Sequence, residues 1–255
     1  MTKRQSRLLE YLVVVLIIGV VLALLRPVVS DREPFHREHC RSRLTRLGLA
    51  LQNYHDVYGA FPPAWLADAN GQPLHSWRVL LLPFLGHQDI YDAYRFDEPW
   101  NGPNNAELQE KVARELGDVL SCSSDWKNMK QAASYLAVVG PHAAWAGGQS
   151  FRKGIDFSDG PANTILVVEV NDSGIAWFEP RDLEIDGMCF GINDPSNCGI
   201  RSQHRHNTYW TYSIKSKFAH VIYADGSVAE LPDTTPPRIV RALLTRDGGE
   251  EVPGR

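Results

Sequence analysis

The first strong pattern along the chain is an unbroken apolar run near its start. Residues 8–25 read LLEYLVVVLIIGVVLALL, and Glu10 is their only charge. At about 1.5 Å per residue, a helix of this length spans roughly 27 Å, close to the thickness of a bilayer's hydrocarbon core. The run therefore predicts a transmembrane helix that begins at Leu8 and ends at Leu25.

Basic residues on one side of this run predict its orientation. Lys3, Arg4 and Arg7 precede it, so the positive-inside rule places residues 1–7 in the cytoplasm. The C-terminal part then lies in the periplasm or at the cell surface, held by a single pass through the inner membrane. A cleaved signal peptide is the competing interpretation, but the run is long and no Ala-x-Ala site follows it, which favours a retained anchor.

Glu10 lies near the start of the predicted anchor. A carboxylate inside a bilayer is costly unless it is paired or close to the surface. It would lie either at the headgroup boundary, where the positive end of the helix favours it, or against the N-terminus of a neighbouring subunit. Its position favours the headgroup boundary.

A second helical pattern follows a juncture at residues 26–34, which contains Pro27 and Pro34. Apolar residues then recur at spacings of three and four, which is typical of one face of an amphipathic helix. The stripe consists of Cys40, Leu44, Leu47, Leu51, Tyr54 and Tyr58. Gly59 and the prolines after it end the pattern. The short break is compatible with one long rod, kinked at Pro27.

The remainder of the chain predicts mainly strands joined by loops. Helices are expected at Ala106–Leu116 and Pro237–Thr245, and a long loop at Ile185–Thr208. Runs rich in β-branched and aromatic residues predict strands at Ser134–Val139, Asn163–Val170, Ile175–Phe178 and His220–Ala224. Asp225-Gly226 predicts a hairpin turn. One long helix followed by strands indicates an α+β fold, in which an antiparallel sheet packs on the first helix throughout an extracytoplasmic domain of residues 35–255.

Composition and charge narrow the functional classes. The chain has 255 residues, of which 44% are hydrophobic and 22% charged, as expected for a folded domain. Its net charge is −4, yet the first 30 residues hold four basic residues and one acidic residue. The remaining body is therefore acidic, which argues against nucleic-acid binding.

Candidate metal ligands occur in three groups: His36 with His39, His204 with His206, and Asp156 with Asp159 and Asp172. Only Glu38 and Cys40 lie close enough in sequence to complete a site with His36 and His39, the second histidine pair lacks an obvious third ligand, and the aspartates lack the spacing of a calcium-binding loop. Solvated segments and a turn are the simpler interpretations. No nucleophile elbow, phosphate-binding loop or dinucleotide-binding glycine pattern is present in the sequence. We therefore expect no catalytic, cofactor or metal site.

Four cysteines are the remaining candidates for chemistry: Cys40, Cys122, Cys189 and Cys198. An even number outside the cytoplasm predicts disulfides, and three connectivities are possible. Cys189 and Cys198 enclose a short loop, which favours their pairing. Cys40 and Cys122 would then join the amphipathic helix to the later part of the domain. Buried free thiols are the alternative.

Several blocks of the sequence resemble one known family. Residues 40–63 read CRSRLTRLGLALQNYHDVYGAFPP and include Asn53, Tyr54 and His55. This block resembles the hallmark of the DUF1559 family of pilin-like proteins. Similar blocks follow in order, among them Asp159-Gly160-Pro161-Ala162-Asn163 and Ala224-Asp225-Gly226-Ser227-Val228. The resemblance implies a pilin-like or pseudopilin-like protein.

Two positions depart from the family pattern. Gln5 stands where the family has the glycine after which a prepilin peptidase cuts. We therefore expect the N-terminus to remain uncut. Lys215 stands where the family has a histidine that nine intervening residues separate from Asp-Gly, and His220 occupies a different place in that box.

These observations predict a non-enzymatic, membrane-anchored pilin-like protein with a structural or interaction role. Its expected partners are membrane lipid, through residues 8–25, and other pilin-like subunits. The alternative is a membrane-tethered hydrolase or ligand-binding protein with a site near His204, His206 or His220. A pocket with convergent polar groups at those histidines would favour the alternative.

Overall fold

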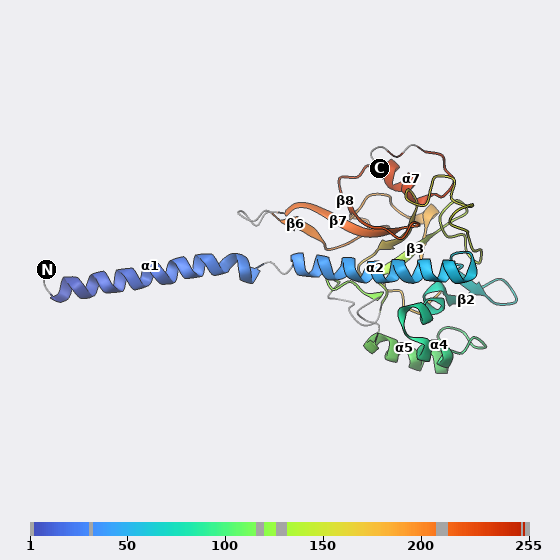
Figure 1. Ribbon diagram of the computed structural model, residues 1–255, viewed down its shortest axis with the longest axis horizontal. Coiled ribbons are helices and arrows are strands. Elements are labelled where there is room, and N and C mark those ends of the chain that lie inside the picture. Colours follow the sequence, from blue (N-terminus) through green and yellow to red (C-terminus); the bar gives the residue numbers. More distant parts are fainter. Residues whose placement is uncertain are drawn as a thin grey trace.

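The molecule consists of a long helical arm and a head (Figure 1). The structure is a computed structural model that describes residues 3–30, 33–115, 120–125, 132–207, 214–250 and 252. The arm is helix α1 (Lys3–Ser30), and the head is everything described from residue 33 onward. Helix α2 (Glu33–Tyr58) runs along the head on nearly the same line as α1.

The arm remains helical beyond the predicted kink. Helix α1 passes through Pro27 to Ser30, and α2 begins at Glu33, so the predicted juncture is helical on both sides of residues 31–32, which lie outside the described residues. A proline inside a helix removes one backbone hydrogen bond, and this loss can be tolerated without ending the helix.

The described side chains of α1 are exposed from Glu10 to Leu24. Those of Leu8, Leu25 and Pro27, which the predicted anchor includes, lie outside the described residues. Across the part of the chain that the structure describes, no helix has both the length and the apolar character to cross a membrane. The membrane anchor therefore stays a prediction.

Helix α2 confirms the predicted amphipathic stripe from Cys40 to Leu51, whereas Tyr54 is only partly buried and Tyr58 is 63% exposed. Cys40, Leu44, Leu47 and Leu51 are fully buried, and the helix packs on strands β7 and β8 of the sheet. It ends where the sequence predicts: Gly59 has φ = 75° and its N–H donates to a carbonyl of the last turn. Glycine adopts this left-handed conformation without steric cost, so it ends the helix.

Six strands form the main sheet: β3 (Tyr135–Val139), β4 (Ile165–Glu169), β5 (Leu183–Glu184), β6 (Arg205–Asn207), β7 (Ile214–Tyr223) and β8 (Val228–Pro232). The order is β5-β3-β4-β7-β6, and β8 also pairs with β7. All pairs are antiparallel except β3 with β5. Helices and a mainly antiparallel sheet are therefore observed together, as expected, with an N-terminal helix and with one parallel edge strand that makes the sheet mixed.

Smaller elements complete the head: β1 (Trp65–Ala67), β2 (Pro73–Ser76), α3 (Trp77–Leu80), η1 (Pro83–Leu85), α4 (Gln88–Ala93), α5 (Pro103–Glu115), η2 (Ile185–Gly187) and α7 (Pro237–Leu244). Helices α5 and α7 and the β7–β8 hairpin at Asp225-Gly226 confirm predicted elements. Every residue of β3 and β4 is buried, so these two strands form the centre of the core.

Two sequence predictions differ from the structure. Ile175–Phe178 is not a strand: it is a buried loop in which Ile175 O accepts from Ala133 N at 2.8 Å. A short apolar run is buried either as a strand or as a loop, and the pattern alone does not separate them. The predicted loop at Ile185–Thr208 also contains η2 and β6.

Both predicted disulfides are present. Cys40 and Cys122 have Cα atoms 5.4 Å apart, and those of Cys189 and Cys198 are 5.2 Å apart. The first bond fixes α2 to the segment before β3. The second closes a short loop that follows η2.

Candidate functional site

Two glutamates and two histidines meet beneath the start of α2. Glu33 opens α2, Glu169 ends β4, His204 directly precedes β6, and His220 lies in β7. The side chains of Glu169, His204 and His220 are fully buried, and that of Glu33 is 9% exposed. We call these four residues the buried His–Glu cluster. Charged and titratable groups are rarely buried so completely unless they are paired.

His204 lies between the two carboxylates. Its Nδ1 is 2.7 Å from Glu33 Oε1, and its Nε2 is 3.5 Å from Glu169 Oε1. His220 approaches the other oxygen of Glu169, with Nδ1 3.5 Å from Oε2, while its backbone N–H donates to the same oxygen at 3.0 Å. The two imidazole rings are 4.8 Å apart and nearly perpendicular.

The cluster is enclosed by the aromatic ring of Phe218 and by the Cys40–Cys122 disulfide. Phe218 stacks on His204, with ring centroids 5.5 Å apart and an interplanar angle of 10°. On another side, Cys122 Sγ is 3.2 Å from His204 Nε2, and Ser124 Oγ is 3.3 Å from Nδ1. Such surroundings exclude bulk water and strengthen every electrostatic interaction inside.

Charge distribution within the cluster follows from this packing. Burial by itself lowers the pKa of His204, but Glu169 and Glu33 outweigh burial and raise it. Burial by itself raises the pKa of Glu169, but His204 and His220 outweigh burial and lower it. The arrangement therefore favours a positive charge close to a negative one.

Some polar atoms of the cluster lack a partner within the described part of the chain. They are Glu169 Oε1 and both ring nitrogens of His220. One donor atom each from Glu169, His204 and His220 lies within 4.8 Å of the other two. Chemically, such a set can share a proton or bind a metal ion.

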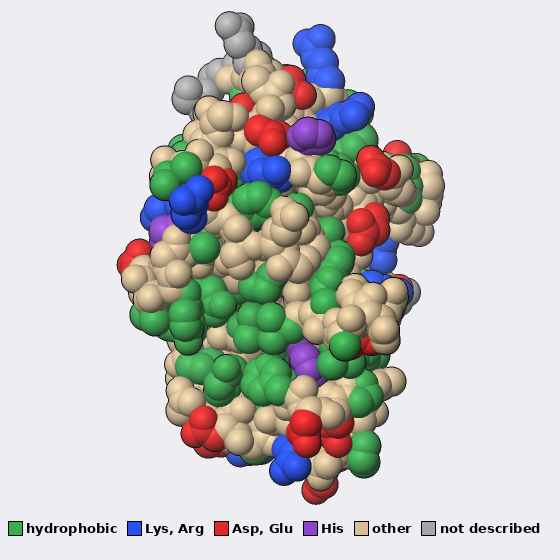
Figure 2. Space-filling view, turned by 90° about the vertical axis from the view of Figure 1, so that its right-hand side faces the viewer, with side chains coloured by type: hydrophobic (Ala, Val, Ile, Leu, Met, Phe, Trp, Pro, Cys, Tyr) green, Lys and Arg blue, Asp and Glu red, His purple; other side chains and the backbone are tan. Residues whose placement is uncertain are grey.

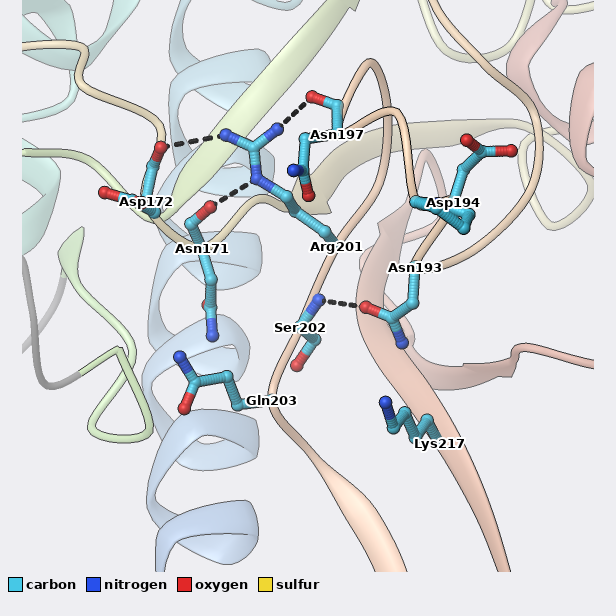
Figure 3. A pocket seen from close by; sticks show the side chains of 10 residues that line it. Asn171, Asp172, Asn193, Asp194, Asn197, Arg201, Ser202, Gln203 and Lys217 are labelled. Carbon is cyan, nitrogen blue, oxygen red and sulfur yellow. Dashed lines mark hydrogen bonds between the residues drawn. The ribbon is translucent and has the colours of Figure 1, made fainter.

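A separate polar pocket of about 410 Å³ opens on the surface (Figure 3). Asn193 and Asp194, from the loop closed by the Cys189–Cys198 bond, form part of its lining together with Asn171, Gln203 and Lys217. None of the histidines singled out from the sequence lines it. The pocket is therefore distinct from the buried His–Glu cluster, although Gln203 directly precedes His204.

Arg201 holds the pocket loop in place. Its guanidinium donates to the carbonyl oxygens of Asn171 at 2.6 Å, of Asp172 at 2.8 Å, and of Asn197 (Figure 3). These bonds join the end of β4 to the disulfide-closed loop. The guanidinium of Arg201 is thus hydrogen-bonded to backbone carbonyl groups of the protein itself.

Comparison with known families gives one match. Residues 32–154 match the family described as "Protein of unknown function (DUF1559)". This match confirms the predicted resemblance to the DUF1559 family. No curated protein and no solved structure matches it. The matched segment contains Glu33 and both cysteines of the first disulfide, whereas the rest of the buried His–Glu cluster lies beyond it.

Motif residues of this protein hold turns and helix ends in place. Asp159 accepts from the backbone N–H groups of Gly248 and Gly249, and Asn163 Nδ2 donates to Asp159 O at 2.9 Å. Gly160 and Gly226 have φ values of 91° and 90°, which suit glycine. These residues shape turns of the backbone.

The hallmark block on α2 also has structural contacts. Tyr54 packs on Phe84 of η1 with ring centroids 5.6 Å apart, and burial raises its pKa to about 12. His55 Nε2 accepts from the backbone N–H of Lys153 at 3.1 Å. Asn53 is exposed. The hallmark thus fastens the second half of α2 to the loops around it.

The metal-ligand groups suggested by the sequence are not brought together. His206 is partly exposed and lies 3.0 Å from Glu230, away from the buried His204. Among the described residues, neither the pair His36 and His39 nor the three aspartates Asp156, Asp159 and Asp172 belong to a group of three potential ligands. Asp156, for example, forms an ion pair with Arg152 at 3.1 Å.

Sequence reasoning missed Glu33 and Glu169 as site residues. Glu169 ends the apolar run ILVVE of β4, and a carboxylate in such a run is a usable signal of a buried charge. His220 sits similarly inside the apolar sequence of β7. Their convergence with His204 depends on strand pairing, which no local pattern shows.

Proposed function

We propose that this chain is a non-enzymatic, membrane-anchored, pilin-like protein that displays its head outside the cytoplasm. The observation that carries the proposal is the exposed apolar surface of α1. Between Tyr11 and Leu24 the described side chains are apolar, apart from a glycine, and all of them are exposed. A helix that is hydrophobic all round needs an apolar environment, and lipid supplies one.

The position of the arm supports a display role. Helix α1 extends away from the head, and α2 continues its line across the sheet (Figure 1). The end of the head opposite α1 presents a group of hydrophobic side chains between charged margins (Figure 2). Apolar surface of this kind is typical of interaction sites, and other pilin-like subunits are the partners we propose.

Fractionation and a topology reporter test the anchor. We expect the full-length protein to remain with membranes at high salt, and a reporter fused after Arg255 to be active only outside the cytoplasm. A matched variant, Leu16→Arg with Ile17→Arg, places two charges at the middle of the run and should release the protein from membranes. Recovery of the unaltered chain in the soluble fraction would contradict the proposal.

The mass of the purified membrane protein tests processing. Gln5 replaces the small residue that a prepilin peptidase requires, so we expect an intact N-terminus. Gln5→Gly is the matched variant that restores the glycine at the cleavage position. A mature wild-type chain that begins at Ser6 would refute this expectation and would favour a subunit of a processed filament.

A further inference from the structure

The buried His–Glu cluster has the chemistry of a metal centre. Glu169 offers a carboxylate oxygen, and His204 and His220 offer imidazole nitrogens, all from fully buried side chains. We propose that these three residues bind one divalent transition-metal ion, with Zn²⁺ as the simplest case. This site goes beyond the display function, because neither the anchor nor the surface of the head requires it.

The spacing of the donor atoms is the first argument. His204 Nε2 lies 3.5 Å from Glu169 Oε1, and His220 Nδ1 lies 3.5 Å from Glu169 Oε2. Both distances are long for hydrogen bonds between charged groups, which are about 2.7–2.9 Å. Zinc ligands at about 2.0–2.1 Å in tetrahedral geometry lie about 3.3–3.5 Å from one another. The two histidine–glutamate separations, one to each oxygen of Glu169, are close to this spacing, and one donor atom from each of the three residues lies within 4.8 Å of the other two.

The unsatisfied nitrogens of His220 are the second argument. Neither ring nitrogen has a hydrogen-bond partner in the described part of the chain, although the side chain is fully buried. Glu169 Oε1 also lacks a hydrogen-bond partner among the described residues. Buried polar groups without partners are rare and cost stability. A metal ion bound to His220 and Glu169 would satisfy atoms from both residues at once.

Outer contacts orient the ligands, which is the third argument. Glu33 Oε1 lies 2.7 Å from His204 Nδ1, so this nitrogen carries the proton and the lone pair of Nε2 faces Glu169. A carboxylate on the far nitrogen of a histidine ligand is the usual outer partner in zinc sites. The backbone N–H of His220 likewise donates to Glu169 Oε2 at 3.0 Å and so orients the carboxylate.

A shared proton is the competing interpretation. An imidazolium at His204, held between Glu33 and Glu169, would account for the contacts of that one ring. The shared proton leaves both ring nitrogens of His220 without a hydrogen-bond partner among the described residues. A metal ion would bind one of these nitrogens. Two imidazoles and one carboxylate also suit Zn²⁺ and its transition-metal neighbours, whereas Ca²⁺ and Mg²⁺ prefer all-oxygen sites.

Metal titration of the full-length protein in detergent tests the proposal. After treatment with a chelator, we expect the protein to bind one Zn²⁺ per chain and to melt at a higher temperature as free Zn²⁺ increases. Co²⁺ in place of Zn²⁺ should give the visible absorption of a low-symmetry site with nitrogen and oxygen ligands. Absence of stoichiometric binding together with an unchanged melting temperature would overturn the proposal and favour the shared proton.

Variants assign the ligands. His220→Gln and Glu169→Gln should abolish stoichiometric binding, and Glu33→Gln should weaken it by about 10- to 100-fold, as expected for an outer partner. His75→Gln is the matched control, because His75 is also buried but bonds to Tyr94 Oη at 2.8 Å outside the cluster. Equal Zn²⁺ affinity in the wild type and in folded His220→Gln would refute the assignment. If these variants fail to fold, the wild-type stoichiometry and Co²⁺ spectrum still decide.

Discussion

Removing the Cys40–Cys122 disulfide is expected to destabilise the head more than removing Cys189–Cys198. The perturbation is a pair of double variants, Cys40→Ser with Cys122→Ser and Cys189→Ser with Cys198→Ser, so that neither leaves a reactive thiol. The first bond spans 82 residues of sequence and the second spans 9. A cross-link restricts the unfolded chain more strongly when the loop it closes is longer.

The magnitude follows from those separations. In the chain-entropy relation, the longer loop contributes about 4.5 kcal/mol and the shorter about 2.6 kcal/mol at 25 °C. The difference of about 2 kcal/mol corresponds to a gap of about 4–8 °C in melting temperature for a domain of this size. Cys40 is also fully buried on α2, so its replacement disturbs packing and adds to the loss.

Thermal and denaturant unfolding of the full-length chain in detergent measure the effect. The two double variants should be compared with the wild type under oxidising conditions and again with reductant, where the three proteins should converge. Equal loss of stability in both variants would refute the reasoning. It would mean that the bond at Cys40 does not restrict the unfolded chain as its loop length requires.

Three further predictions concern the head. Gly226→Ala should cost more stability than Gly71→Ala, since both glycines have φ near 80–90° but only at Gly226 would a new Cβ meet a neighbouring side chain within 4 Å. Arg78→Met should cost about 3–5 kcal/mol, because it leaves the buried carboxylate of Asp182, 2.5 Å from the guanidinium, without its ion-pair partner. His75 should make stability fall as the pH drops below about 6.5, because burial lowers its pKa in the folded state although a backbone hydrogen bond partly opposes this.

Denaturant titrations check all three. Equal losses in the two glycine variants would show that the added contact at Gly226 is relieved without cost. A loss under about 1 kcal/mol for Arg78→Met would show that Asp182 finds other compensation. His75 binds a proton more readily in the unfolded state than in the folded state. Its contribution to the free energy of unfolding is therefore retained above the unfolded-state pKa and lost as the pH falls below it. His75→Gln should remove that part of the pH dependence, and an unchanged slope would contradict the assignment.

Patterns over a few neighbouring residues predicted the elements whose formation depends on residues close together in the sequence. The stripe from Cys40 to Leu51 identified α2 and its buried face, and Asp225-Gly226 identified the β7–β8 hairpin. The parallel pairing of β5 with β3 had no such local signature, because it depends on a connection across the core.

The buried His–Glu cluster could not be predicted from the sequence for a similar reason. The sequence placed His204 near His206 and His220, but it did not indicate that the carboxylate partners of His204 come from α2 and β4. Glu33 in addition lay in the segment interpreted as a juncture. Tertiary pairing, and not sequence proximity, assembles this site.

The Cys40–Cys122 bond has a mechanical consequence when the head is pulled through α1. Tension that enters through α1 reaches Cys40 early in α2 and passes through the covalent bond to Cys122. Residues 41–121 are therefore outside the load path between the arm and anything attached to the sheet. Reduction of the bond would place those residues in series and release about 28 nm of additional contour length, at roughly 3.5 Å per extended residue. The disulfide thus sets how far the head can be extended by a pulling force.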